Sequence, residues 1–208
     1  MRKYLAALLS VVIIISSNCS LGISAYADDT ENKPSETRFD ESGAFQLSID
    51  DFAGDLLDVF KDLKVDLGTW VAESGIFKTK DGRRLESCYV AKSGRAPNLS
   101  KDWYVSIHGY DEKGVFVDGS TTKDIVRLNA EIPMDEPEYA AATLISMVMV
   151  CDPTLSKTES QSIIVELTEE VSKDQKNTHI ENGICYVIYA NPIFENSLVF
   201  EIYADENA

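Results

Sequence analysis

Short turn sequences divide much of the chain into hairpins, and they constrain its fold more than any other feature. Asp81-Gly82 and Asn182-Gly183 are two-residue hairpin signals, because Asp, Asn and Gly tolerate the positive φ that such turns require. Asp111–Gly114 (DEKG) has the composition of a further turn. Strands joined by short hairpins run antiparallel, so these turns predict an antiparallel sheet.

The segments beside these turns have the composition of strands, and the clearest of them alternate apolar and polar residues. Five such segments precede residue 133 and three follow residue 176, namely Thr69–Lys80, Arg83–Lys92, Trp103–Tyr110, Val115–Asp118, Asp124–Ile132, Asn177–Glu181, Ile184–Tyr189 and Ser197–Ala204.

Three other segments have the periodicity of helices. Ser48–Leu63 carries apolar residues at helical spacing behind a serine N-cap. Tyr139–Val150 is apolar nearly all round, which favours burial on most sides. Ser156–Glu159 (SKTE) is a capping-box pattern that opens a helix running to about Lys173. The order α-βββββ-αα-βββ predicts an α+β fold, an antiparallel β-sheet with helices packed on one face.

The tripeptide Cys-Tyr-Val occurs twice, beginning at Cys88 and at Cys185, each time in the second strand of a predicted hairpin. This repeat raises the hypothesis of two pseudo-repeated halves. If the two strands are neighbours, a Cys88–Cys185 disulfide is expected, because an exported protein can keep such a bond. The other interpretation is that these cysteines are reduced thiols packed as small apolar residues.

Residues 1–27 resemble a signal peptide. Arg2 and Lys3 precede an apolar run at Leu5–Ile15, and small residues before Asp28 favour cleavage after Ala27. The sequence therefore predicts a secreted, extracellular protein. The alternative is a lipid anchor at Cys19, although the residues before that cysteine depart from the usual lipidation pattern.

The rest of the chain is strongly acidic. Residues 1–27 hold two of the 19 basic residues and none of the 35 acidic ones, which leaves a net charge of −18 after cleavage. Such a charge repels phosphate, so no nucleic acid partner is expected. Residues 28–43 read as a flexible acidic tail and 44–208 as a single α+β domain. Tyr139–Val150 is too short to span a membrane, so the mature chain has no predicted transmembrane segment.

The sequence contains no recognisable catalytic, metal or cofactor signature. Structural zinc needs closely spaced Cys and His pairs, and His108 and His179 are the only histidines. The tight glycine-flanked serine of a hydrolase, the acidic loop of a calcium site and the Gly-rich loop of a phosphate site are all missing. We therefore predict no catalytic, metal-binding or cofactor-binding residue.

One predicted strand surface is a candidate binding face. Tyr104, Ser106, His108 and Tyr110 alternate with Val105 and Ile107, so they point to the opposite side of the sheet. If helices cover the apolar side, these four residues form an exposed aromatic row. Such rows offer a large contact area and a polar tip, although exposed tyrosines are also common in strands that bind nothing.

Three functional hypotheses follow from these patterns. The first is a secreted non-enzymatic binding domain for another protein or an envelope component. The alternative is a small extracellular hydrolase with an acidic active site, because acidic residues are plentiful. The third is an accessory domain that assembles with partners through its acidic tail.

Overall fold

The structure, a computed structural model, describes residues 10, 37–63, 69–78, 84–94, 104–115, 117, 124–169, 171 and 176–205. For 69–78, 84–94 and 104 it describes the backbone path only. The predicted signal peptide and the proposed anchor at Cys19 lie outside the described residues, apart from Ser10.

The elements follow the predicted order closely. They are α2 (Ile49–Asp62), β1 (Thr69–Lys78), β2 (Arg84–Gly94), β3 (Tyr104–Tyr110), β4 (Arg127–Pro133), α3 (Pro137–Cys151), α4 (Lys157–Glu169), β5 (Asn177–Glu181), β6 (Ile184–Ala190) and β7 (Ser197–Ala204).

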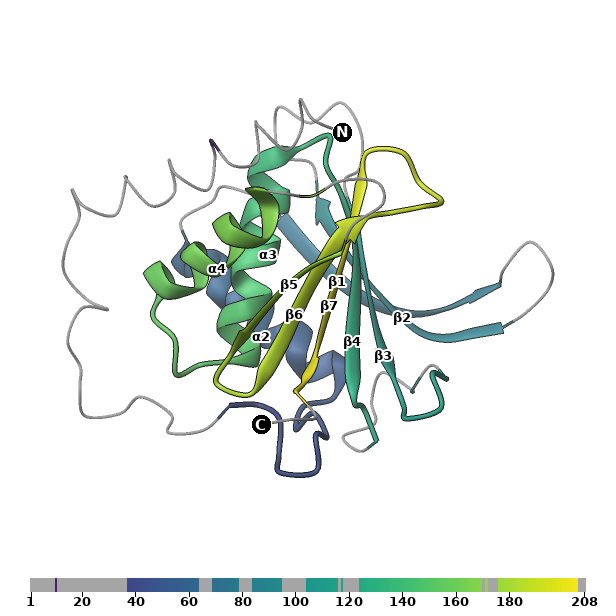
Figure 1. The fold of residues 1–208 in the computed structure, drawn as a ribbon. Coiled ribbons are helices and arrows are strands. Elements are labelled where there is room, and N and C mark those ends of the chain that lie inside the picture. Colours follow the sequence, from purple (N-terminus) through teal and green to yellow (C-terminus); the bar gives the residue numbers. More distant parts are fainter. Residues whose placement is uncertain are drawn as a thin grey trace.

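All seven strands form one antiparallel sheet in the order β1-β2-β3-β4-β7-β6-β5. The helices lie on one side of it (Figure 1). α2 packs against β1, β2, β3 and α3, whereas α3 contacts β4 and α4 contacts β5 and β6. The predicted α+β class, with helices on one face of an antiparallel sheet, is confirmed.

Helix α2 begins where its capping residues predict. The Ser48 Oγ accepts a hydrogen bond from the Asp51 backbone N–H at 3.0 Å, which satisfies one of the donors left open in a first turn. The helix buries one apolar stripe that includes Phe52 and Leu56. It approaches β3 so closely that a Cβ on Gly109 would lie 3.2 Å from the Ile49 Cδ1 atom. A larger side chain at 109 would therefore need the Ile49 or Ile125 side chain to move by a few tenths of an ångström.

The other two helices have different roles. α3 is buried on almost every side, as its apolar sequence predicts, and forms the middle of the helical layer. α4 opens with the predicted capping box: the Ser156 N–H donates to Glu159 Oε2 at 2.6 Å, and the Glu159 N–H donates to Ser156 Oγ at 3.2 Å. α4 ends at Glu169, earlier than predicted.

One predicted strand is confirmed only in part. Val115–Asp118 was expected to pair back onto β3, and Val115 and Val117, the described residues of that segment, belong to no strand. The segment nevertheless returns to the end of β3, because the Asp111 N–H donates to the Val115 carbonyl oxygen at 2.9 Å and the Val117 N–H donates to the Gly109 carbonyl oxygen at 3.0 Å. The Asp111 carboxylate closes the turn between them, since its Oδ1 accepts the backbone N–H groups of Lys113 and Val115 at 2.9 and 2.8 Å.

The predicted start of the domain at residue 44 is several residues late. Phe39 lies in the segment predicted to be a flexible tail, yet only 8% of it is exposed. Its ring packs 5.1 Å from that of Phe45, and the neighbouring Arg38 N–H donates to the Cys151 carbonyl oxygen. One aromatic side chain is enough to fix this end of the tail on the domain. Residues 28–36 lie outside the described part of the chain.

Both Cys-Tyr-Val tripeptides lie in the middle strand of a three-strand meander. These meanders are β1-β2-β3 and β5-β6-β7, and they stand at opposite ends of the sheet with β4 between them. A helix precedes each meander in the chain, α2 before the first and α4 before the second. The strand order therefore has the outline of the two pseudo-repeated halves.

This same arrangement contradicts a Cys88–Cys185 disulfide, which the sequence offered as the alternative to reduced, buried thiols. Three strands separate β2 from β6, a distance of roughly 19 Å at the usual strand spacing. A disulfide needs Cα atoms within about 7 Å of each other. Cys185 is a free, buried thiol. The order of strands in space, which the sequence does not reveal, decides this point.

Candidate functional site: the open face of the sheet

Strand β3 has the two-sided character that the sequence predicts. Val105 and Ile107 are fully buried against the helices, so Ser106, His108 and Tyr110 lie on the opposite side. We call that side the open face, because none of the described helices packs on it (Figure 1). Tyr104 lies in β3, but its side chain is outside the described part of the chain.

The expected exposure of this row holds only in part. Ser106 and Tyr110 are half-buried, but His108 is only 8% exposed, so the prediction that this histidine belongs to a solvent-exposed patch is wrong. β3 lies inside the sheet, with β2 and β4 as neighbours, and the Tyr110 ring centroid is 6.4 Å from that of His108. His108 is therefore buried although no described helix packs on its side of the sheet.

Strand pairing extends the open face into rows that cross the sheet. The first two rows take one residue each from β3, β4, β7, β6 and β5, and the third ends at β6. The residues are Tyr110, Arg127, Tyr203, Cys185 and Ile180 in the first row, His108, Asn129, Glu201, Val187 and Thr178 in the second, and Ser106, Glu131, Val199 and Tyr189 in the third. Lys176, just before β5, lies beside Tyr189.

Glu201 is the centre of a hydrogen-bond network on this face. Its Oε1 accepts from the Tyr189 hydroxyl at 2.9 Å and from Asn129 Nδ2 at 3.4 Å. Its Oε2 pairs with Lys176 Nζ at 3.3 Å, and the Glu201 side chain is only 11% exposed. A buried carboxylate needs such partners, because desolvation of an unpaired charge is costly.

Two cations of this face rest on tyrosine rings. The Arg127 guanidinium lies 4.8 Å from the centroid of Tyr110, and Lys176 Nζ lies 4.3 Å from that of Tyr189. Both distances are within the range of a cation–π attraction. The rings hold the two charges against the sheet, which limits the side-chain freedom lost when a ligand binds.

Burial and hydrogen bonding set the protonation of the remaining groups. Burial lowers the pKa of His108 to about 4, so its imidazole is neutral at neutral pH. Burial raises the pKa of Glu131. The hydrogen bond with Cys185, together with burial, raises the pKa of Tyr203 to about 12. Burial also raises the pKa of the Cys185 thiol, which makes it a poor nucleophile.

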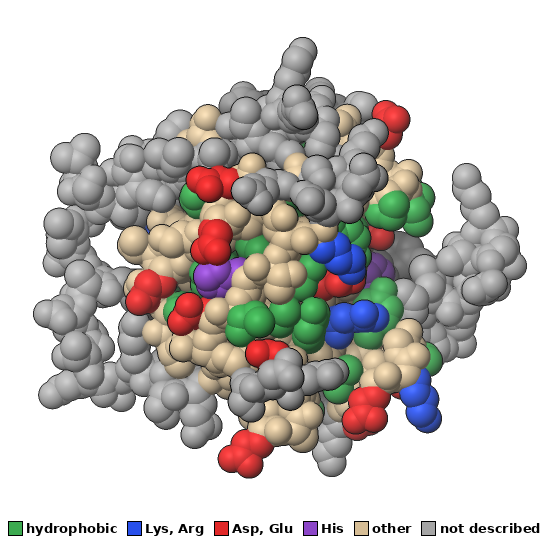
Figure 2. Space-filling model, viewed as in Figure 1, with side chains coloured by type: hydrophobic (Ala, Val, Ile, Leu, Met, Phe, Trp, Pro, Cys, Tyr) green, Lys and Arg blue, Asp and Glu red, His purple; other side chains and the backbone are tan. Residues whose placement is uncertain are grey.

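The charge of the open face differs from that of the helical layer. α2 and α4 together carry eight acidic and two basic residues. The rows of the open face, with Lys176, carry two of each, and one of the acids is Glu131 with its raised pKa. Figure 2 shows basic side chains beside a histidine and apolar groups near the middle of the view, with acidic side chains mostly around them. The open face is therefore a locally less acidic part of an acidic protein.

Sequence reasoning missed most of this site. It found the row on β3 but not its continuation through Arg127, Asn129, Glu201 and Tyr189. The polar positions of β4 alternate clearly, which was a usable signal for the side they occupy. The pairing of β4 with β7 joins residues 72 positions apart, as in the Asn129–Glu201 bond, and no local pattern predicts it.

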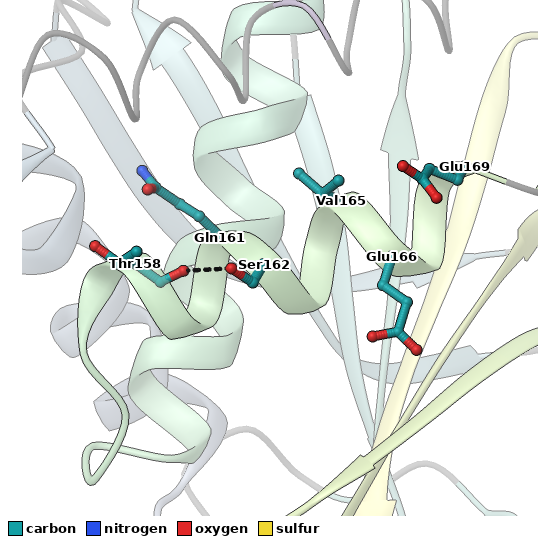
Figure 3. A pocket seen from close by; sticks show the side chains of 6 residues that line it. All are labelled: Thr158, Gln161, Ser162, Val165, Glu166 and Glu169. Carbon is teal, nitrogen blue, oxygen red and sulfur yellow. Dashed lines mark hydrogen bonds between the residues drawn. The ribbon is translucent and has the colours of Figure 1, made fainter.

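A second group of residues lies on the helical side. His179 Nδ1 is 3.1 Å from Glu166 Oε2, and His179 Nε2 is 3.6 Å from Glu181 Oε2. Glu166 also lines an open hollow of about 370 Å³ along α4. In Figure 3 the Glu166 side chain points away from Gln161 and Val165, toward the strands. His179 Nε2 is buried, so this nitrogen is not placed to exchange a proton with a molecule in the hollow.

Within the described residues, no group of three or more His, Cys, Asp or Glu side chains is arranged to hold a metal ion. Among the same residues, no helix has both the length and the apolar character needed to cross a bilayer.

Comparison with known proteins finds no matching family, no matching curated protein and no matching solved structure. The function must therefore be argued from the geometry and chemistry of the site itself.

Proposed function

We propose that this chain is an exported, non-enzymatic binding domain whose open face contacts another protein or an envelope component. The observation that carries the proposal is the composition of that face: tyrosines and an arginine, held by fixed contacts, on strand positions that the core does not use. Tyrosine and arginine are enriched among the residues that dominate binding energy at protein interfaces.

The network around Glu201 supports this role. Tyr189 donates to Glu201 and carries Lys176 on its ring, so both side chains are ordered before any partner arrives. A preorganised surface loses less conformational entropy on binding than a set of mobile side chains. Export, which the N-terminal sequence favours, would place the partner outside the cell or on its envelope.

The hydrolase alternative rests on a different place, the pair of Glu166 and His179. An acid–imidazole pair is part of many catalytic sites. Here the hollow is lined by six described residues of a single helix, and the second imidazole nitrogen is buried beside Glu181. These features favour a structural tie between α4 and β5, so the binding proposal has the stronger support.

The test is affinity capture from the native culture medium with matched variants. Tyr110→Ala removes contact area from the open face, and Thr178→Arg adds a bulky side chain to an exposed position on it. Ser162→Arg adds the same bulk to an exposed position on α4 and serves as the control.

Wild type and Ser162→Arg should capture the same partner, and each open-face variant should bind it at least about tenfold more weakly, as expected for a central interface position. Equal capture by all four proteins, or loss with Ser162→Arg alone, would contradict the proposal. Unfolding curves for each variant separate loss of binding from loss of the fold.

A further inference from the structure

We infer that Arg127 is a carboxylate receptor, and that the partner presents an acidic side chain to it. This inference rests on the proposed function of the open face and specifies the chemistry of its partner.

The two cations of the open face differ in their partners. Lys176 is paired with Glu201, so its charge is already balanced. Arg127 makes no ion pair with any carboxylate in the described part of the chain, and its Nε is buried without a hydrogen-bond acceptor there. Of these two charges, the one on Arg127 is left for a ligand.

The surroundings of Arg127 suit a planar anion. Tyr110 supports the guanidinium at 4.8 Å, and strand pairing places Tyr203 on the other side of Arg127. A guanidinium offers parallel N–H donors that match the two oxygens of a carboxylate. Because Arg127 is half-buried, water competes for these donors less than it would at a fully exposed arginine.

The acidic helices limit where an acidic ligand can approach the protein. The chain carries a net charge of −16, so an acidic ligand is repelled over most of its surface. The open face lacks the acidic excess of α2 and α4. A carboxylate is therefore expected to bind on the Arg127 side of the sheet rather than on the helical side.

The experiment observes the arginine side-chain Nε–Hε signals by NMR while hexaglutamate is added to the full chain, with hexaglutamine and inorganic phosphate as separate arms. Both peptides are amidated at the C-terminus, so that only hexaglutamate carries carboxylates. The Arg127 signal should shift saturably with hexaglutamate and stay in place with hexaglutamine. The signal of Arg38, which is paired with Asp55, should not move.

Arg127→Gln should weaken hexaglutamate binding at least about tenfold, as loss of a charge-assisted contact predicts. Lys61→Gln, the same change of charge on α2, should leave binding within about twofold, because its charge is exposed and screened.

An unmoved Arg127 signal, an equal response to hexaglutamine, or tighter binding of phosphate than of hexaglutamate would overturn the inference. If Tyr110→Ala and Thr178→Arg lose the natural partner while hexaglutamate has no effect, the proposed function stands and the carboxylate inference fails. Urea unfolding of Arg127→Gln shows whether that variant keeps its fold.

Discussion

The two faces of the sheet are built from the same strands, yet they have opposite chemistry. On β7 the side chains of Leu198, Phe200 and Ile202 are fully buried against the helical layer. Glu201, between two of them in sequence, faces the other way and holds a network of polar contacts. The apolar core therefore lies mainly on the helical side, and the other side combines a polar network with half-buried residues such as Tyr110, Arg127 and Tyr189.

The largest expected effect separates the two faces on a single strand. Ile107→Ala on the helical side of β3 should lower the free energy of unfolding by about 2–5 kcal/mol, because it leaves a cavity in a packed core. Ser106→Ala on the open side should cost below about 0.5 kcal/mol. Urea unfolding measures both. Equal losses in the free energy of unfolding would show that the open side of β3 stabilises the fold as much as the helical side does.

Acid should reveal the buried histidine of the open face. The pKa of His108 is about 4 in the folded protein and about 6.5 in the unfolded chain, so between these values only the unfolded state takes up a proton. Its contribution is present above about pH 6.5 and is lost as the pH falls to about 4, a change of about 3 kcal/mol.

His108→Gln should remove that part of the pH dependence while the carboxylates still contribute theirs. The measurement is the free energy of unfolding from pH 7 to pH 4 for both proteins. Parallel curves would mean that His108 is protonated in the folded state, and therefore less buried than the structure has it.

A smaller effect compares ion pairs on the two sides of the molecule. Glu201→Gln removes the charge that holds Lys176 in a nearly buried network, and it should cost about 1–2 kcal/mol. Lys61→Gln breaks the pair with Asp58 on α2, where both side chains are 75% exposed, and should cost below about 0.5 kcal/mol. Thermal unfolding distinguishes the two. A larger loss of stability for Lys61→Gln than for Glu201→Gln would show that the Glu201 network stabilises the fold no more than an exposed ion pair does.

Local patterns predicted the helices and most strands because the relevant physics is local. The two serines cap helices as predicted, Ser48 at the start of α2 and Ser156 at the start of α4. The Asn182-Gly183 dipeptide adopts positive φ values of 49° and 76° in a tight turn, also as predicted. Asp111 was recognised as part of a turn, but the two hydrogen bonds by which its carboxylate closes that turn were not foreseen.

Long-range order was not accessible from the sequence. The insertion of β7 beside β4 separates Cys88 from Cys185 and brings Arg127 and Asn129 next to Tyr203 and Glu201. Alternation in the sequence therefore indicated only the β3 part of the candidate site, and the rest depended on strand order.

The most direct test of the account is hydroxyl-radical footprinting of the side chains, with and without the partner captured from the culture medium. The account predicts that labelling of Tyr110 and Tyr189 falls when the partner binds, while labelling of the exposed Phe194 loop and of Val59 on α2 stays the same. Unchanged tyrosines together with protection of the helical layer would contradict it.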